Sequence, residues 1–458
     1  MKAKRYLAAL LAALMLLPAV LTGCTAANDP EPETKTTDAP ANTQTAKTPH
    51  DMLVAAPAPA VFVSFPEDPN QDDEWWDACV ARRKAGVDPS SVADFTKTMT
   101  AILAQSCGNE NLAWSPVNVY IALAMLAEVT DGETRSQIVT ALGASGMDEL
   151  RANVTALLTA DNYDDGHTTS LMADSIWLND DYGFKTETLE RLAEIYRASS
   201  YWGDPADEEF NNALRGWLKE NTRGLLDDQA DGIKLTPETV LAICTAIYFK
   251  GSWGAEFSKD ATREDVFHSP KGDITCDFMH KSSSSDAYYV GDGFTAVYET
   301  LNGSYNGVWF LLPDEGSSIE EMLASNGFAE ILSGKASGDS GTVIDISMPK
   351  FDISSDLELI PALLEMGVED CFDPVASDFT PLTDDTDELY VSRIKHCARV
   401  KTDEEGIEAA AFTVIWVYAG SMPPDTRIEF TLDRPFAFVL TGVTGAPLFI
   451  GVVNDPGK

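Results

Sequence analysis

The residue types that most often carry chemistry in proteins are scattered along this chain. There is no GxSxG nucleophile motif, no HExxH zinc motif and no glycine-rich phosphate loop. The histidines stand in no catalytic or metal-binding spacing: His50, His167, His268, His280 and His396. The sequence therefore predicts that the protein is not an enzyme.

The sequence gives equally little support for a metal site. Asp161–Gly166 (DNYDDG) resembles a calcium loop, but Met172 stands where that loop needs a bidentate glutamate, so we interpret it as an acidic turn. We predict neither a metal nor a cofactor, because no CxxC pair or zinc spacing occurs among the six cysteines after Cys24: Cys79, Cys107, Cys244, Cys276, Cys371 and Cys397. Their disulfide pairing stays open. The apolar neighbours of Cys244 and Cys397 favour buried thiols at these two positions.

The chain is long and strongly acidic. Its 458 residues, 44% of them hydrophobic, can bury one large core or two ordinary ones. The formal net charge of -41 argues against nucleic acids and anionic membrane surfaces as partners, because neither attracts a polyanion. The charge favours solubility and, at most, basic partners.

The N-terminus has the pattern of an export signal. Three basic residues among the first five precede an apolar run over residues 6–20, which is too short to span a membrane comfortably. Residues 21–24 (LTGC) resemble the lipobox of bacterial lipoproteins. That resemblance implies that residues 1–23 are a signal peptide and that Cys24 is acylated, which would anchor the exported chain to the outer face of a bacterial membrane or cell surface. The alternative is an ordinary cleaved signal peptide.

Three segments follow the signal. Residues 24–60 are rich in Thr, Ala, Pro, Asn and Asp without hydrophobic periodicity, which predicts a disordered tether. Residues 61–88 form an N-terminal extension of unassigned role, in which two adjacent tryptophans and a cysteine indicate a short helix. Residues 89–458 are expected to form the folded domain.

Within this domain, helix patterns come first and strand patterns mostly later, which indicates an α+β fold. Apolar residues at helical spacing predict helices over 90–105, over 121–126 and from Glu133 onward. The continuous apolar run Thr239–Phe249 predicts a central strand covered on both faces. The other predicted strands are Met348–Ile353, Leu389–Lys401 and a closing hairpin of Phe430–Leu440 with Pro447–Val453.

The segment Lys401–Pro424 combines features of a loop and of a buried strand. Its charged start passes through Gly406 into a run of small and β-branched residues that carries no charge from Ala409 to Met422. Alternate positions of the run suit the centre of a sheet, yet its flanks are typical of an exposed loop. This combination indicates a conformational switch.

Six motifs occur in the order found in one known family. They are NLAWSP at 111–116, AIYFKGSW at 246–253, MPKF at 348–351, Asp378–Phe379, EEGIEAAA at 404–411 and FTLDRPFAFVL at 430–440. Each is weak alone, but together and collinear they resemble the serpin family across residues 90–458.

The resemblance implies a serpin fold, which is an α+β domain with a large central mixed sheet, further sheets, about eight to nine helices and an exposed reactive loop. It also implies an inhibitor of serine proteases that acts as a suicide substrate. The protease would cleave the loop and stay acyl-linked to it, while the freed loop inserts as a new strand in the main sheet. The competing hypothesis is a non-inhibitory serpin-fold protein that binds partners or acts as a scaffold on the cell surface.

The hinge of the family corresponds to eight residues here: Glu404, Glu405, Gly406, Ile407, Glu408, Ala409, Ala410 and Ala411. Neither proline nor a charge occupies an inward-facing position of this hinge, so the resemblance implies a loop that can insert. The family usually has Thr or Ser where this chain has Ile407. We expect that isoleucine to leave insertion equal or slower, and not to prevent it.

In the family, the cleaved bond follows the residue sixteen positions after the hinge glutamate. Counting from Glu404 places the bond between Gly420 and Ser421, with Ala419 and Tyr418 as nearby alternatives. Small residues there favour elastase-like or subtilisin-like proteases, whereas cleavage after Tyr418 would favour chymotrypsin-like enzymes. The lack of Lys and Arg in this part of the loop disfavours tryptic targets.

Opening of the sheet in this family depends on a polar cluster around a Ser, a His and an Asn. The matching positions are Ser115, Asn118, Thr245 and His396, with Thr245 in place of the family's Asn. Trp253 is expected where the loop first enters the sheet. We expect a monomer that meets the membrane only through its lipid anchor.

Overall fold

The computed structural model of the chain describes residues 52–66, 72–86, 88–284, 287–302, 305–336, 343–386, 388–408 and 427–457. Several sequence predictions lie outside these residues: the signal peptide, the acylated Cys24, hinge residues Ala409–Ala411, and the cleavage-site residues Tyr418, Ala419, Gly420 and Ser421.

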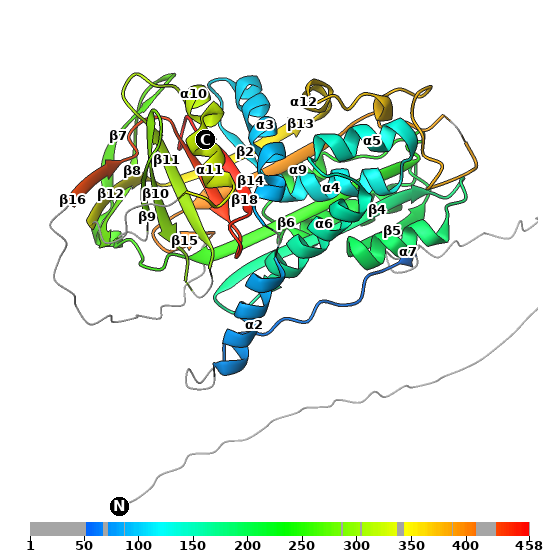
Figure 1. Ribbon diagram of the computed structural model, residues 1–458, viewed down its shortest axis with the longest axis horizontal. Helices are drawn as coiled ribbons and strands as arrows, with labels where there is room; N and C mark the ends of the chain where they lie inside the picture. The colour runs from blue at the N-terminus through cyan, green and yellow to red at the C-terminus, as the bar shows by residue number, and fades with distance from the viewer. Residues whose placement is uncertain are drawn as a thin grey trace, which may run out of the picture. The chain divides into compact units, whose positions relative to one another are not determined.

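Eleven α-helices, eight of them with seven or more residues, surround three β-sheets in the described part of the chain (Figure 1). Helices α2 to α9 precede β6 and most strands follow it, so the predicted α+β fold is confirmed. None of the helices among the described residues is long and apolar enough to cross a membrane. The helices are α2 Asp73–Ala85, α3 Ser90–Cys107, α4 Pro116–Glu128, α5 Gly132–Ala141, α6 Met147–Asp161, α7 Thr186–Ile195, α8 Glu208–Asn221, α9 Asp227–Asp231, α10 Ile319–Ala324, α11 Asn326–Leu332 and α12 Ile360–Glu365.

The largest sheet has the strand order β1-β5-β4-β6-β15-β14-β13, with β3 paired to β4. Most of its neighbouring strands are antiparallel, but β4 and β5 are parallel, so the sheet is mixed. Its strands are β1 Leu53–Ala55, β3 Tyr163–Asp164, β4 Thr168–Asn179, β5 Ala198–Gly203, β6 Leu241–Ser252, β13 Phe351–Glu358, β14 Lys395–Thr402 and β15 Gly406–Ile407.

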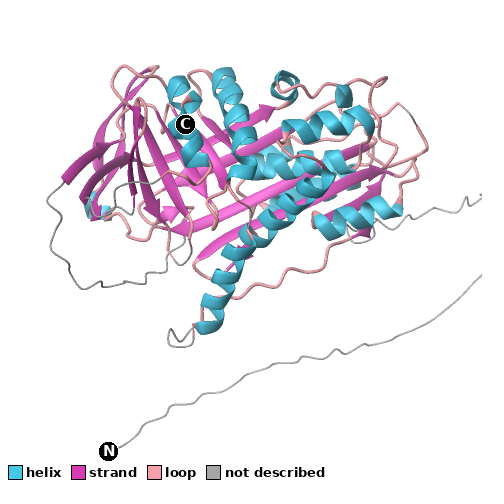
Figure 2. Ribbon diagram, in the orientation of Figure 1, coloured by secondary structure: helices cyan, strands magenta, loops and turns pink. Residues whose placement is uncertain are grey.

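Two smaller sheets gather at one end of the molecule, while α4 to α7 lie over the other end (Figure 2). Their strand orders are β2-β18-β17-β11-β10-β9 and β16-β12-β8-β7. Their strands are β2 Leu112–Trp114, β7 Arg263–Ser269, β8 Gly272–Ser284, β9 Ala287–Val290, β10 Phe294–Thr300, β11 Gly307–Pro313, β12 Val343–Pro349, β16 Arg427–Thr431, β17 Phe436–Thr441 and β18 Pro447–Val453.

Strand β6 lies at the centre of the large sheet because elements pack on both of its faces. Eleven consecutive residues of β6 pair antiparallel with β4. Ile247 and Phe249 join the main core together with α4, whereas Ala242 and Cys244 pack beside residues of α8. Residues on both faces of such a strand must be apolar. The central strand predicted from the apolar run of residues 239–249 is therefore confirmed.

Three predicted elements differ from the structure. Only the part of Leu389–Lys401 from Lys395 onward is a strand, and the apolar residues before it pack without strand partners. The predicted strand Phe430–Leu440 is divided near Pro435, which lacks a backbone donor, so β16 and β17 belong to different sheets. Leu53–Ala55 lies inside the predicted disordered tether but pairs with β5 as β1.

The helix of the N-terminal extension packs beside the turn that leads from β3 into β4. Helix α2 contacts α6, and its Trp75 is buried. Its Arg82 forms an ion pair of 3.1 Å with the buried Asp165, which directly follows β3. The short helix predicted here is confirmed, and one buried ion pair fastens it to the main sheet.

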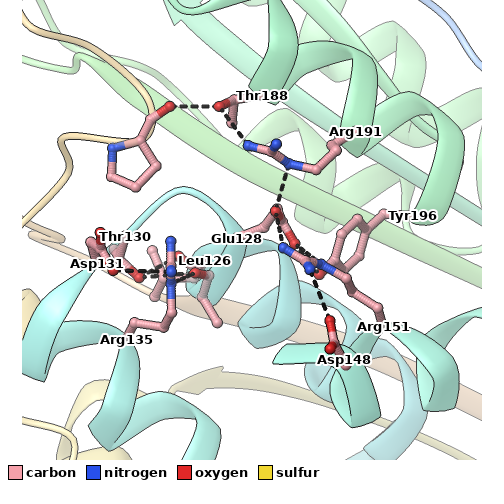
Figure 3. A network of polar contacts seen from close by, with 12 residues as sticks. Leu126, Glu128, Thr130, Asp131, Arg135, Asp148, Arg151, Thr188, Arg191 and Tyr196 are labelled. Atoms are coloured by element: carbon pink, nitrogen blue, oxygen red, sulfur yellow. Dashed lines mark hydrogen bonds and ion pairs between the residues drawn. The ribbon is translucent and has the colours of Figure 1, made fainter. Parts of the chain in front are cut away.

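One buried carboxylate joins three helices (Figure 3). Glu128 ends α4, and its carboxylate accepts two hydrogen bonds of 2.9 Å from Arg151 of α6. It also accepts one of 3.0 Å from Tyr196 after α7 and lies 2.8 Å from Nε of Arg191 in α7. Burial alone would raise the pKa of Glu128, but Arg151, Tyr196 and Arg191 together hold the pKa below its ordinary value. The Glu128 carboxylate therefore links helices α4, α6 and α7 to one another.

Replacing Glu128 tests how much this junction stabilises the fold. We expect Glu128→Ala to lower the free energy of unfolding by about 2 kcal/mol, because two arginines lose the carboxylate that they share. Asp148→Ala removes the exposed partner of the same Arg151 and should cost less than about 0.5 kcal/mol. Denaturant unfolding measures both variants, and equal losses would contradict this role of Glu128.

Candidate functional site

The start of the predicted hinge already lies inside the large sheet. Strand β15 is Gly406–Ile407, and Ile407 pairs with Thr402 of β14 on one side and with Gly251 of β6 on the other. A Cβ on residue 406 would lie 2.2 Å from the carbonyl oxygen of Gly251, so only glycine fits there. The side chain of Ile407 is buried in the core at 3% exposure. An isoleucine at this position is thus accommodated by the core.

Beyond this short strand, β6 and β14 are not paired with each other. Within the described residues, each of them pairs with β15 and with its outer neighbour, and no ladder joins the two directly. The first five residues of β6 are also only partly buried. We call the space between residues 241–250 of β6 and residues 395–401 of β14 the slot. Its two edges present backbone groups that a further strand would satisfy.

The chain leading into β15 is held by the end of β6. The backbone N–H of Trp253 donates to the carbonyl of Glu405 at 3.0 Å, and its indole Nε1 donates to the carbonyl of Asp403 at 2.9 Å. The N–H of Phe257 donates to the carbonyl of Glu404 at 3.0 Å. Trp253 is therefore beside the start of the hinge, and its role in loop entry stays a prediction.

Glu404 is the charged anchor of this segment. Its carboxylate forms an ion pair of 2.7 Å with Lys350, between β12 and β13, and accepts a hydrogen bond of 2.8 Å from the Thr262 hydroxyl. Burial would raise the pKa of Glu404, but the bonds from Lys350 and Thr262 hold it below its ordinary value. The neighbouring Glu405 pairs with the exposed Lys259 instead. Lys350 was not singled out from the sequence, although it stands inside the MPKF motif.

The predicted polar cluster is only partly assembled. The backbone N–H of Ser115 donates to Nε2 of His396 at 3.0 Å, and the Ser115 hydroxyl caps α4 by accepting from the N–H of Asn118 at 3.2 Å. Burial lowers the pKa of His396 to about 4, so its ring is neutral and carries its proton on Nδ1. Counting six residues back from the pairs at Ile407 places Thr245 level with His396 across the slot.

A buried acid beside this cluster was missed from the sequence. Asp174 of β4 pairs directly with Thr245, and its Oδ2 has no hydrogen-bond partner. Burial raises its pKa well above the ordinary value for aspartate, which favours the neutral form of the group. Its strand gave no motif that would have singled it out.

The far end of the loop is fixed in another sheet. Residues 409–426, which lie outside the described residues, connect β15 to β16. Strand β16 runs parallel to β12 at the edge of the four-stranded sheet, and Arg427 forms an ion pair with Asp345 of β12. The exposed bait predicted for this loop is thus attached at both ends to separate sheets.

The described residues hold no group of three or more His, Cys, Asp or Glu side chains that could bind a metal ion. The six described cysteines are free thiols, and Cys244 and Cys397, which were predicted to be buried, are half-buried. The geometry shows a sheet with one short strand, β15, paired between β6 and β14.

Comparison with known proteins identifies this architecture. Residues 90–456 match the family described as serpin (serine protease inhibitor). The chain belongs to the serpin family. Putative serpin-Z6C of Oryza sativa subsp. japonica is 29% identical over 396 residues, which cover 79% of this chain and 94% of that relative. Alpha-1-antiproteinase 2 of Equus caballus is 28% identical over 376 residues, which cover 80% and 86%.

Solved serpin structures share the fold. The native state of the thermophilic serpin tengpin has a TM-score of 0.71 at 24% identity and covers 86% of this chain and 97% of its own. Human thyroxine-binding globulin complexed with its hormone has a TM-score of 0.69 at 21% identity, covering 82% and 100%. The predicted serpin fold is confirmed. The description of the family supports protease inhibition in general, and not an enzymatic activity.

Comparing variants of Glu404 and of the neighbouring Glu405 tests whether the Glu404–Lys350 ion pair stabilises the fold. We expect Glu404→Gln to lower the free energy of unfolding by about 1–2 kcal/mol at pH 7, because Lys350 loses the nearer of its two acidic partners and keeps only Asp277 at 3.8 Å. A lowered pKa stabilises the fold above the ordinary pKa of glutamate and stops doing so as pH falls through the lowered value. The difference between wild type and variant should therefore shrink in acid. Glu405→Gln is the matched control with a small effect, and equal effects at both positions would contradict the assignment.

Proposed function

We propose that this serpin inhibits a serine protease as a suicide substrate, with cleavage of its reactive loop near Gly420–Ser421. The observation that carries the proposal is β15, which already occupies the mouth of a slot that no other described strand fills. The membership of the chain in a family described as serine protease inhibitors supports the same function.

The chemical step would follow ordinary acyl transfer. The protease serine attacks the carbonyl carbon of Gly420, the peptide bond to Ser421 breaks, and the new amine of Ser421 leaves with a proton from the general acid of the protease. The Gly420 carbonyl then remains as an ester on the enzyme. Hydrolysis would complete cleavage, whereas rapid loop insertion would remove the acyl-enzyme from its productive geometry.

Insertion is favourable only if the loop residues fit the slot. A new central strand would satisfy backbone groups along both edges, at a net gain of about 1 kcal/mol for each hydrogen bond. Continuing the alternation of Ile407, the inward positions are Ala409, Ala411, Thr413 and Ile415, none of which is charged. Small residues near the cleaved bond favour elastase-like or subtilisin-like targets.

The proposed location follows from the sequence alone. The lipobox-like residues 21–24 support acylation of Cys24 and anchoring of a monomer to the outer face of a bacterial membrane or cell surface. Residues 25–51 would then act as a spacer between the lipid and the folded domain.

A matched pair of loop variants tests inhibition. We expect wild type to form a covalent complex with elastase or subtilisin that survives denaturing electrophoresis. Ala411→Glu would bury an unpaired charge at a cost of several kcal/mol, so the chain should be cleaved without complex formation. Ala410→Glu places the same charge on the opposite face and should keep most of the complex. Cleavage of wild type without any complex would contradict the proposal and favour a non-inhibitory binding protein.

A second experiment tests the anchor. We expect Cys24→Ser, expressed in a bacterial host, to move the protein from the membrane fraction to the soluble exported fraction, because acylation needs the thiol. Thr25→Ser is the matched control and should stay with the membrane. Equal fractionation of wild type and Cys24→Ser would contradict lipid anchoring.

A further inference from the structure

The three sheets of the described part of the chain meet at the ammonium group of one buried lysine. Lys281 belongs to β8 of the four-stranded sheet. Its Nζ forms an ion pair of 2.7 Å with Glu299 of β10, in the six-stranded sheet. It also donates a hydrogen bond of 2.8 Å to the carbonyl of Ala255, which follows β6 of the main sheet. Both charged side chains are 7% exposed, so a buried ion pair connects the two smaller sheets to the chain that leaves the main sheet.

The aromatic residues around this ammonium are the residues that hold the start of the hinge. Nζ of Lys281 lies 4.4 Å from the ring centre of Phe257 and 5.6 Å from the ring centre of Trp253, and both distances are within the range of a cation–π contact. The N–H groups of these two residues donate to the carbonyls of residues 403–405. Trp253 and Phe257 thus bind the hinge through their N–H groups and the lysine through their rings.

The backbone beside the lysine joins the same two sheets. Residues 252–254 at the end of β6 are connected to residues 300–302 by two hydrogen bonds of 2.8 Å and one β-bridge. Residues 300–302 directly follow Glu299, the partner of Lys281. Lys281 extends this junction along the chain, because it binds the carbonyl of Ala255 and the ring of Phe257.

The ion pair contributes direction more than stability. Burial of an ammonium is costly unless its donors are satisfied, and two of the three donors of Lys281 are directed at Glu299 and at the carbonyl of Ala255. The other oxygen of Glu299, Oε1, is buried without a hydrogen-bond partner in the described part of the chain. Apolar side chains of similar volume often stabilise a fold as well as a buried ion pair does. What they cannot supply is a cation held at one point between a carbonyl and two aromatic rings.

We propose that Lys281, held by Glu299, is a positioning residue for the start of the hinge. It fixes residues 253–257, and these residues in turn fix the carbonyls of residues 403–405, directly before β15. The consequence for protease trapping rests on the proposed function. A hinge held in one place lets insertion begin from Gly406–Ile407 without a preceding search, so that insertion competes better with hydrolysis of the acyl-enzyme.

Hydrogen–deuterium exchange of the intact chain tests the positioning without any protease. The double variant Lys281→Met with Glu299→Met removes both charges and leaves no charge buried alone, so denaturant unfolding should show a stability close to wild type. We expect the amides of residues 252–258 to exchange about tenfold faster than in wild type, because the cation–π contacts and the bond to Ala255 are lost. Amides of β17, in the core of the six-stranded sheet, should exchange at the wild-type rate.

Two outcomes of the exchange experiment would overturn the proposal. Wild-type exchange at residues 252–258 in the double variant would mean that the ion pair only stabilises the fold. An increase by the same factor at residues 252–258 and in β17 would mean that the whole domain is loosened. Lys271→Met is the matched control, because it removes the exposed ion pair of another lysine with Glu110, just before β8, and should leave both rates unchanged.

The role in trapping has a separate measurement. With elastase or subtilisin, denaturing electrophoresis gives the ratio of cleaved chain to covalent complex. We expect this ratio to rise about threefold in the double variant, because a loosened hinge must be ordered before insertion can begin. Lys271→Met should keep the wild-type ratio. An unchanged ratio in the double variant would contradict the role of Lys281 in trapping.

Failure of this inference can be told apart from failure of the proposed function. A wild-type chain that is cleaved but never trapped contradicts the proposed inhibition, while faster exchange at residues 252–258 in the double variant would still support the positioning. A wild-type chain that traps proteases, together with wild-type exchange in the double variant, contradicts the role of Lys281 alone.

Discussion

Two residues join the main sheet of this serpin across its middle. Gly406 and Ile407 pair with β6 on one side and β14 on the other, and among the described residues nothing else bridges these two strands. The pairing requires glycine at position 406, where any side chain would collide with Gly251, and an apolar side chain at position 407. The slot and the path of the rest of the loop both depend on this short strand.

Contacts hold the chain at three places: before β15, directly after it, and at the far end of the loop. Trp253 and the Glu404–Lys350 ion pair hold the segment before it. The backbone N–H of Glu408 after it donates to the carbonyl of Lys401 in β14, and Arg427 pairs with Asp345 in another sheet at the far end of the loop. Each contact is modest, at about 1–3 kcal/mol. Together they would oppose the insertion that we propose.

The sequence predicted best those features that depend on a few neighbouring residues, such as apolar runs and short motifs. The apolar run at 239–249 predicted a central strand of the sheet, and the six collinear motifs indicated the family that residues 90–456 then matched. Predictions failed where the structure of a segment depends on which distant strand it pairs with. Pro435 separates β16 from β17, and Leu53–Ala55 pairs with an edge strand that composition does not reveal. Strand pairing depends on distant residues, so local pattern specifies it weakly.

By itself, the sequence determined the α+β class and the order of the elements, and it predicted which loop residues would enter the sheet. Only the tertiary structure decided that Gly406–Ile407 are already paired there, and that Lys350 and Thr262 bind the carboxylate of Glu404. The physical reason is that hydrophobic period and turn chemistry are encoded within a few residues, whereas these contacts join segments more than fifty residues apart. Their side chains are common types whose burial and charge acquire meaning only when the sheet brings them together.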